Sequence, residues 1–165
     1  MNPLPLQFRD DVSNEDIKAV AEIVVSTGFF YEHEIEVAVE LIETRLLKGE
    51  ESGYRFLFAM QGDRTIGYSC FGTIPCTMGS YDLYWIVVHN DFRALGIGRK
   101  LLAETETRIT GEKGRAVYAE TSSQTKYAPT RNFYEKNGYA AEAVLKDFYA
   151  PGDDKFIYKK RLNAT

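Results

Sequence analysis

The stretch Phe92–Leu102 (FRALGIGRKLL) places two glycines, Gly96 and Gly98, directly ahead of a run of helix-forming residues. The first turn of a helix presents unpaired N–H groups and a partial positive charge, and both attract anions. Glycine also removes the side chain that would keep a phosphate away from the backbone. The stretch is therefore interpreted either as a phosphate-binding loop or as an ordinary turn from a strand into a helix.

The charges around these glycines favour phosphate binding. The first helical turn usually carries Asp or Glu, and a cation there costs roughly 0.3–1 kcal/mol. Here Arg99 and Lys100 occupy that turn, Arg93 stands just before it, and Glu104 and Glu106 follow only later. A bound polyanion would account for this inversion of the usual pattern.

Two other phosphate loops do not fit the sequence. A dinucleotide fingerprint requires a third glycine at the position of Leu101. A P-loop requires Lys after its last glycine, with another glycine five positions earlier, whereas Gly98 is followed by Arg99 and has no such partner. If this stretch binds phosphate, it therefore does so neither as a dinucleotide fingerprint nor as a P-loop.

The elements that must position this loop follow from hydrophobic periodicity. Strands are predicted at 6–9, on both sides of a Gly62-Asp63 turn within 54–74, and at 81–88, 115–121, 139–149 and 154–162. Helices are predicted from 13–16 up to Gly28, at 32–48, from the glycine loop to about Ile109, and at 129–138. The resulting order is β-α-α-β-β-β-α-β-α-β-β, which is typical of an α/β protein of the α+β kind.

Several helix ends carry their own signals. Ser13 and Asp16 have the spacing of a capping pair, and Gly49 is expected to stop the helix at 32–48. Pro129 suits the first position of a helix, and Gly138 suits the left-handed residue just past its end.

Length, charge and cysteine usage limit the class of protein. The 165 residues suit one domain, 1–165, and the net charge of −4 argues against non-specific nucleic-acid binding. Neither a signal peptide nor a transmembrane span is predicted, so we expect a cytoplasmic protein without membrane association. Cys70, Cys76, His33 and His89 lack metal-site spacing, so no metal is predicted.

Two motifs together indicate a family. VHNDFRALGIGRKLL resembles the acyl-CoA pyrophosphate motif of the GNAT superfamily of N-acetyltransferases, in which a strand ending in Val precedes R-x-x-G-x-G/A and a helix. RNFYEKNGY resembles the family's second signature, F-Y-E-K-x-G-F/Y, and the element order resembles the whole GNAT fold. The resemblance implies a mixed, mostly antiparallel central sheet of about six to seven strands flanked by about four helices.

The resemblance also implies a cofactor site for acetyl-CoA (coenzyme A). Backbone N–H groups of the loop would hold the pyrophosphate, and the end of the preceding strand would bind the pantetheine arm. The residues carried over are Arg93, Ala94, Leu95, Gly96, Ile97, Gly98 and Arg99 in the loop, and Ile86, Val87 and Val88 in the strand. An N–H group near Val87 or Val88 would polarise the thioester carbonyl.

The sequence departs from the family pattern at two positions. Asn90 stands where Pro is frequent, and Tyr127 stands where many members have an Asn that contacts the cofactor arm. Tyr127, Thr130 or Arg131 is expected to supply that polar contact instead.

By the same resemblance, Tyr134 matches the tyrosine that protonates the departing CoA thiolate. A phenol with a pKa of about 10 is protonated at pH 7 and can act as that acid. The alternative is a packing role, because Gly138 would bring Tyr139 back onto Phe133 or Tyr134.

A general base is expected from the family pattern, although some members rely on water instead. Asp82 lies six residues before Val88 on the predicted central strand, and Glu120 ends the next strand. Each is a candidate to remove a proton from the amine, and the alternative for Asp82 is a solvated acid at a strand start.

Two loops are expected to line the acceptor pocket, one between the first two helices and one between the last two strands. Their aromatic and acidic residues would suit a cationic amine. The candidates are Phe29, Phe30, Tyr31, Tyr84, Tyr149 and Asp154, with Tyr84 on the same strand face as Asp82. For Asp153 and Asp154 the alternative is a simple polar turn.

Three functions follow from these residues. The first is transfer of an acetyl group from acetyl-CoA to a primary amine by direct attack in a ternary complex, with a small molecule or a peptide as acceptor. The second is a non-catalytic acyl-CoA-binding or regulatory domain of the same fold. The third is an interaction module with a decayed site. Exposed apolar strand edges would also permit a homodimer.

Overall fold

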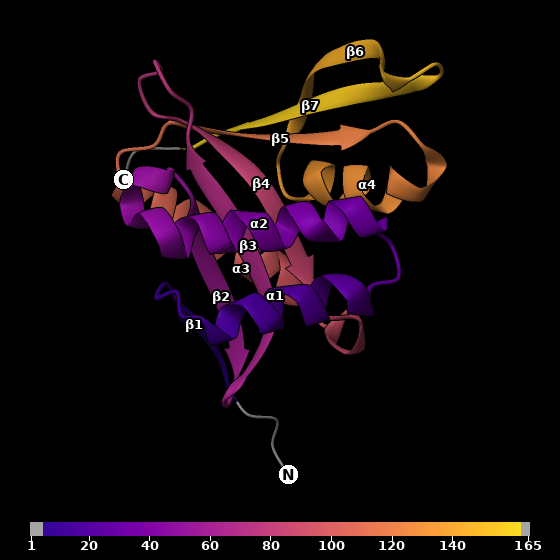
Figure 1. The fold of residues 1–165 in the computed structure, drawn as a ribbon. Coiled ribbons are helices and arrows are strands. Elements are labelled where there is room, and N and C mark those ends of the chain that lie inside the picture. The colour runs from indigo at the N-terminus through magenta and orange to yellow at the C-terminus, as the bar shows by residue number, and fades with distance from the viewer. Residues whose placement is uncertain (1–4, 163–165) are drawn as a thin grey trace. The chain divides into compact units, whose positions relative to one another are not determined.

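The computed structural model describes residues 5–162, which form seven strands and four α-helices in the predicted order (Figure 1). The strands are β1 Leu6–Arg9, β2 Arg55–Gln61, β3 Arg64–Thr73, β4 Ser80–Val88, β5 Ala116–Ser122, β6 Ala140–Ala150 and β7 Asp153–Arg161. The helices are α1 Glu15–Ser26, α2 Glu32–Lys48, α3 Ile97–Gly111 and α4 Ala128–Lys136. Each predicted element is therefore present, with its ends shifted by a few residues at most.

The strands follow the order β1-β2-β3-β4-β5-β7-β6 in one mixed sheet. β4 and β5 are parallel, from Ser80 opposite Ala116 to Leu83 opposite Ala119. The pairs β1–β2, β2–β3, β5–β7 and β6–β7 are antiparallel. This confirms the mostly antiparallel sheet that the family resemblance implied.

The chain divides into two compact units. Unit 1 comprises residues 5–72 and 85–107, and unit 2 comprises 73–84 and 108–162. β4 contributes its first half to unit 2 and its second half to unit 1.

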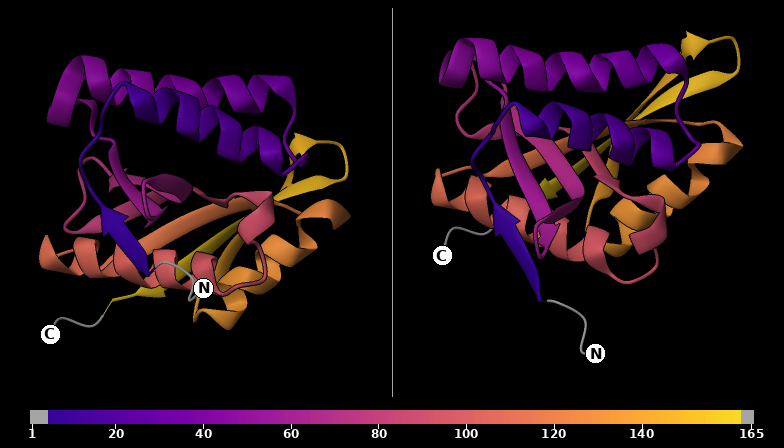
Figure 2. Two further views of the ribbon diagram at one scale, coloured as in Figure 1. Left: turned by 90° about the horizontal axis from the view of Figure 1, so that it is seen from below. Right: turned by 60° about the horizontal axis from the view of Figure 1, so that its bottom comes forward.

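Unit 1 is built on the β2–β3 hairpin, which turns at Gly62-Asp63 as predicted. α1 and α2 lie side by side along the hairpin (Figures 1 and 2). Their buried residues, such as Val20 and Ile42, pack with Phe56 and Tyr68 in one core cluster. On β3 the side chain of Ser69, next to Tyr68, bonds instead to Thr105 of α3 at 2.7 Å. The hairpin is therefore covered by α1 and α2 on one face and contacted by α3 on the other. These contacts hold α3 in place, and with it the segment that leads into the helix.

The start of α1 differs from the prediction in one respect. The carboxylate of Asp16 accepts bonds from the backbone N–H and hydroxyl of Ser13, at 2.8 and 3.0 Å. The reach back from Asp16 is therefore confirmed. However, the Ser13 hydroxyl donates to Asp16, and the N-cap is Asn14, without a side-chain cap.

Unit 2 contains β5, β6, β7, the first half of β4, and α4. Alternate residues of β7 serve opposite faces of the sheet, as the period of a strand requires. Tyr158 contacts α4, with its hydroxyl 2.9 Å from Glu135 and its ring 5.7 Å from that of Tyr134. Lys155 and Lys159 lie on the other face and pair with Glu120 and Glu142. β7 therefore separates the surroundings of α4 from a row of ion pairs.

The ends of α4 follow the sequence signals closely. Pro129 occupies the second rather than the first helical position, because the helix already begins at Ala128. Gly138 has a φ of +87° just past the end, as predicted for the left-handed residue.

Candidate active site

The glycine loop, defined here as residues 93–98, leads from β4 into α3. Gly96 has a φ of +74° and Ala94 a φ of +61°, so left-handed residues alternate along the loop. Such alternation brings neighbouring N–H groups together in an anion-binding concavity. A Cβ added at Gly96 would meet no atom within 4 Å, so the backbone is open to a ligand at this point.

The surface of this loop is cationic. Arg93, Arg99 and Lys100 are exposed, and the first turn of α3 contains no acidic residue. Leu95 is 65% exposed, whereas Ile97 is buried and anchors the start of the helix. The predicted strand, loop and helix are therefore present, with N–H groups and positive side chains at the helix start.

The end of β4 supplies the three strand residues of the predicted cofactor site. Val87 is buried in the unit 1 core, while Ile86 and Val88 are half-buried. β3 approaches closely here: a Cβ at Gly67 would lie 3.0 Å from the Val87 carbonyl oxygen. His89, which follows, donates its N–H to Ile66 at 2.8 Å and accepts from the N–H of Asp91 through Nδ1 at 3.2 Å. These bonds give His89 a structural role at the end of β4.

The aromatic side chains of the turn between α1 and α2, at positions 29–31, have different surroundings. Phe30 packs against Phe29 and Trp85, with ring centroids 5.1 and 4.9 Å apart. Tyr31 is 58% exposed and stacks on His33 at 5.8 Å. Phe30 thus belongs to the edge of the unit 1 core, and Tyr31 is the member of this turn most available to a ligand.

In unit 2, Tyr134 lies on α4 in an aromatic cluster. Its ring is 5.4 Å from Tyr139 and 5.6 Å from Phe133, and the Tyr139 N–H donates to the Tyr134 carbonyl at 3.0 Å. The predicted return of Tyr139 onto Tyr134 is therefore confirmed. Burial raises the pKa of Tyr134 well above its usual value, so the hydroxyl holds its proton at neutral pH.

The two other α4 residues predicted at the cofactor site have different surroundings. Thr130 is half-buried on the first turn of the helix. Arg131 donates through Nη1 to the carbonyls of Ser122 and Gln124, at 2.6 and 3.1 Å. Arg131 therefore ties α4 to the segment after β5.

The candidate bases Asp82 and Glu120 lie on one face of unit 2. Asp82 is paired with Tyr118, two residues before Glu120, so the three side chains share a side of the β4–β5 pair. Lys155 of β7 places its Nζ 2.5 Å from Oε2 of Glu120. We refer to Asp82, Glu120 and Lys155 as the acid–lysine cluster.

Charges within this cluster act on Asp82. Burial raises the pKa of Asp82, the charge of Glu120 raises it further, and the charge of Lys155 lowers it, with a net rise. Aromatic residues from β6 complete the surroundings: the Lys155 ammonium is 3.8 Å from the ring of Phe148 and 5.8 Å from that of Tyr149. A carboxylate whose pKa is moved toward neutrality is suited to accept a proton.

The two acids at the β6–β7 turn have distinct roles. Asp153 is buried and accepts from the Ser122 hydroxyl at 2.5 Å and from Nε2 of Gln124 at 2.6 Å. Asp154, the predicted acceptor-binding residue, forms an ion pair with Lys146 at 2.7 Å. Asp153 is thus a structural residue of the turn, and Asp154 has an internal partner that any ligand would have to share.

Sequence reasoning missed Lys155, which pairs with the candidate base Glu120, and Phe148, whose ring contacts that lysine. Their placement depends on the register of β7, in which Lys155 lies opposite Ser122 of β5 and Leu145 of β6. The alternation of the last strand could have placed Lys155 and Lys159 on one face, but it carries no information about which acids lie opposite.

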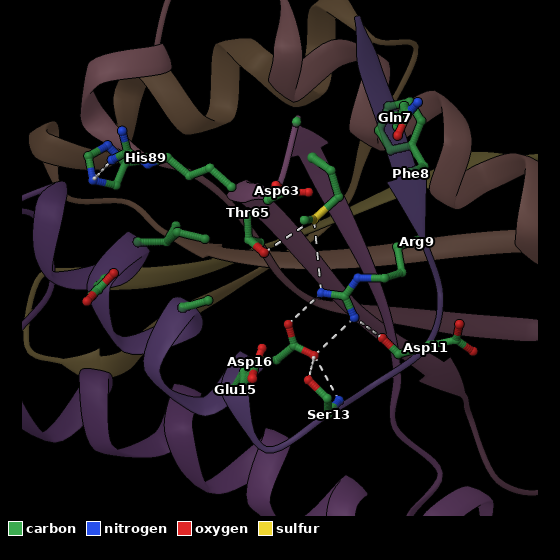
Figure 3. A pocket seen from close by; sticks show the side chains of 16 residues that line it. Gln7, Phe8, Arg9, Asp11, Ser13, Glu15, Asp16, Asp63, Thr65 and His89 are labelled. Carbon is green, nitrogen blue, oxygen red and sulfur yellow. Dashed lines mark hydrogen bonds and ion pairs between the residues drawn. The ribbon is translucent and has the colours of Figure 1, made fainter. Parts of the chain in front are cut away.

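A separate pocket of about 710 Å³ lies in unit 1, among β1, α1 and the β2–β3 turn (Figure 3). In Figure 3 the Arg9 guanidinium points to Asp16, and the two form an ion pair at 2.6 Å. Burial raises the pKa of Asp16, but Arg9 and Ser13 outweigh this effect and lower it overall. None of the residues predicted to bind cofactor or acceptor lines this pocket.

Within residues 5–162, no helix combines the length and apolarity that a bilayer crossing requires. The same residues contain no group of three or more His, Cys, Asp or Glu side chains arranged to hold a metal ion. Cys70 and Cys76 are both free thiols, the first buried and the second exposed.

Comparison with known proteins assigns the family. The family model described as an acetyltransferase (GNAT) domain matches residues 52–141, which include the glycine loop and α4. An N-alpha-acetyltransferase of Sulfurisphaera tokodaii is 30% identical over 132 residues, which cover 78% of this chain and 73% of that protein. The chain therefore belongs to the GNAT acetyltransferase family.

Solved structures agree with this assignment. A crystal structure from Desulfovibrio desulfuricans, assigned to the GNAT acetyltransferases, has 48% sequence identity and a TM-score of 0.93, covering 95% of this chain and 99% of that one. An N-acetyltransferase from Thermoplasma acidophilum in complex with coenzyme A has the same fold. Its TM-score is 0.74 at 21% identity, with 96% of this chain and all of that chain covered. The GNAT fold expected from the two sequence motifs is thus confirmed.

Proposed function

We propose that the protein transfers an acetyl group from acetyl-CoA to a primary amine by direct attack in a ternary complex. The observation that carries the proposal is the glycine loop, whose open, left-handed backbone and exposed arginines fit a pyrophosphate. Relatives of this fold that are solved with coenzyme A or acetyl-CoA support the choice of cofactor.

In this proposal, N–H groups of residues 93–98 bind the pyrophosphate, with Arg99 beside them and Ile86, Val87 and Val88 along the pantetheine arm. The bound cofactor supplies the acetyl thioester. Asp82 or Glu120 takes one proton from the acceptor ammonium, which leaves the nitrogen with the electron pair that forms the new C–N bond. As the C–S bond breaks, the Tyr134 hydroxyl gives its proton to the sulfur, and the second proton lost from nitrogen restores the tyrosine.

The acceptor-binding residues are proposed from the aromatic and acidic side chains that the sequence predicted for this role. Tyr31, Tyr84 and Tyr149 are exposed enough to contact a ligand, and they carry the faces that a cationic amine prefers. The relative from Sulfurisphaera tokodaii is named as an N-alpha-acetyltransferase. We therefore expect peptides with a free α-amino group to be productive acceptors and place them first in any screen.

Two measurements test the proposal. Acetyl-CoA at about 100 times its Kd is expected to add roughly 2.7 kcal/mol of stability, which corresponds to an increase in Tm of about 5–11 °C. NAD and ATP are the matched controls, and neither should produce this shift. Release of the CoA thiol is then followed with α-amino peptides and small amines. Binding without turnover on any acceptor would instead support a non-catalytic acyl-CoA-binding domain.

A further inference from the structure

Lys155 is held in place far more tightly than an ordinary surface lysine. Its side chain is only 12% exposed, and its ammonium lies 2.5 Å from Glu120 and 3.8 Å from the ring of Phe148. The Tyr149 ring is a further neighbour at 5.8 Å. The lysine therefore forms an ion pair and a cation–π contact in a half-buried setting, where both are stronger than in water.

This lysine belongs to a cluster that has more carboxylates than cations. Asp82 and Glu120 carry two negative charges, and Lys155 supplies one positive charge directly against Glu120. Within unit 2, the titratable groups on this face also include Tyr84 of β4, Tyr118 of β5 beside Asp82, Tyr149 of β6, and Lys159 and Arg161 of β7. The Lys159 ammonium lies 5.8 Å from the Tyr118 ring. Lys159 is itself paired with Glu142, at 2.8 Å.

We propose that Lys155 is a positioning residue of the acceptor site: it neutralises Glu120 and so leaves Asp82 as the carboxylate that takes the proton from the acceptor ammonium. The inference rests on the proposed function. In this step an N–H bond of the ammonium breaks, its electron pair stays on nitrogen, and an O–H bond forms on Asp82. Asp82 then releases the proton to water.

The direction of the expected effect follows from the charges. The negative charge of Glu120 raises the pKa of Asp82 and the positive charge of Lys155 lowers it. Removing the lysine charge should raise the pKa of Asp82, so its base form appears only at higher pH. Removing the charge of Glu120 should have the opposite effect.

The experiment measures kcat/KM against pH for acetylation of one fixed acceptor by the whole protein. Replacing Lys155 with Met (Lys155→Met) should move the acidic limb of the profile to higher pH by about one unit, the low end of the effect of a nearby opposite charge. Lys155→Arg keeps the positive charge and should restore the wild-type profile. Glu120→Gln should move the limb to lower pH, and the double variant Lys155→Met/Glu120→Gln should return it toward the wild-type position.

Lys159→Met is the matched control, because it removes a paired lysine from the same face of the same strand without a charge that acts on Asp82. Its profile should coincide with that of the wild type. If Lys155→Met does not fold, the opposite shift in Glu120→Gln still tests the charge coupling.

The outcomes separate this inference from the proposed function. An active wild type whose acidic limb stays in place in both Lys155→Met and Glu120→Gln would overturn the role of Lys155 and leave acetyl transfer intact. A wild type that binds acetyl-CoA but acetylates no acceptor would overturn the proposed function itself. The acceptor's own ionisation is the same for every variant, so it cannot produce a shift between them.

Discussion

The hydroxyl of Tyr134 is the group with the most specific expected role. Its ring packs among Phe133, Tyr139 and Tyr158, and burial keeps its proton in place at neutral pH. If it protonates the departing sulfur, Tyr134→Phe should lower kcat by roughly 10²- to 10⁴-fold. The Kd for acetyl-CoA, measured by calorimetry, should change little, because the ring remains and only the hydroxyl is lost.

A neighbouring tyrosine provides the control for this substitution. Tyr139 contacts the same ring cluster and is equally buried, so Tyr139→Phe removes a hydroxyl from the same aromatic packing. It should leave kcat close to the wild-type value. Equal losses of kcat and of acetyl-CoA affinity in Tyr134→Phe would show that Tyr134 only packs.

At the scale of an element, the glycine loop should bind its ligand through backbone geometry. Gly96 has a φ of +74° and an open space around its missing Cβ. Gly96→Ala should therefore cost about 1–2 kcal/mol of folding stability from the left-handed backbone. We also expect it to weaken acetyl-CoA binding by about tenfold, or 1.4 kcal/mol, because the added methyl lies where the pyrophosphate would approach.

Gly53 supplies a matched control in the same unit. Its φ of +75° is nearly the same, and a Cβ there also meets nothing within 4 Å. Gly53→Ala should lower Tm by a similar amount in thermal melts and leave the acetyl-CoA Kd from calorimetry unchanged. Similar Kd values for both alanine variants would show that the loop is an ordinary turn.

The elements were predictable because their signals are local. Apolar spacing and the end signals at Gly49, Gly62 and Gly138 depend on residues close in sequence, and the structure places each helix and strand accordingly. Cross-strand neighbours are not local. The partners of Asp154 and Glu120, namely Lys146 and Lys155, follow from the β5–β7–β6 register, which no single strand encodes.

The position of Arg131 illustrates a related limit. Arg131 is one of three residues expected to supply the polar contact of the missing Asn, and in the structure its guanidinium bonds to the carbonyls of Ser122 and Gln124. A motif fixes which turn of a helix a residue occupies. It cannot show which backbone carbonyls of another segment lie within reach of a long side chain.

At the scale of the whole molecule, we expect a side chain added in the turn between α3 and β5 to lower the free energy of unfolding. A Cβ at Gly114 would lie 2.2 Å from Cγ2 of Ile109 and 2.8 Å from the Ile109 carbonyl oxygen, so the backbone itself would have to move. Gly114→Ala should therefore lower the free energy of unfolding by about 1–3 kcal/mol. Differential scanning calorimetry should show the loss as a Tm lower by about 2–4 °C per kcal/mol.

Gly111, three residues earlier, gives the opposite expectation. A Cβ there meets nothing within 4 Å, and the residue ends α3. Gly111→Ala should leave Tm unchanged or raise it, because the higher helix propensity of alanine can add up to about 1 kcal/mol of stability. A lower Tm for Gly111→Ala than for Gly114→Ala would contradict the packing described for this turn.

The two faces of β7 have a consequence for how this protein could diversify. Tyr158 faces the helix that carries the proposed acid, whereas Lys155 faces the proposed bases and the aromatic residues of the acceptor side. Substitutions at alternate positions of β7 would therefore affect different parts of the molecule, either the packing against α4 or the surroundings of the proposed bases. We expect variation among related sequences to alternate along β7, with the residues toward α4 constrained by shared chemistry and the opposite ones free to follow each new acceptor.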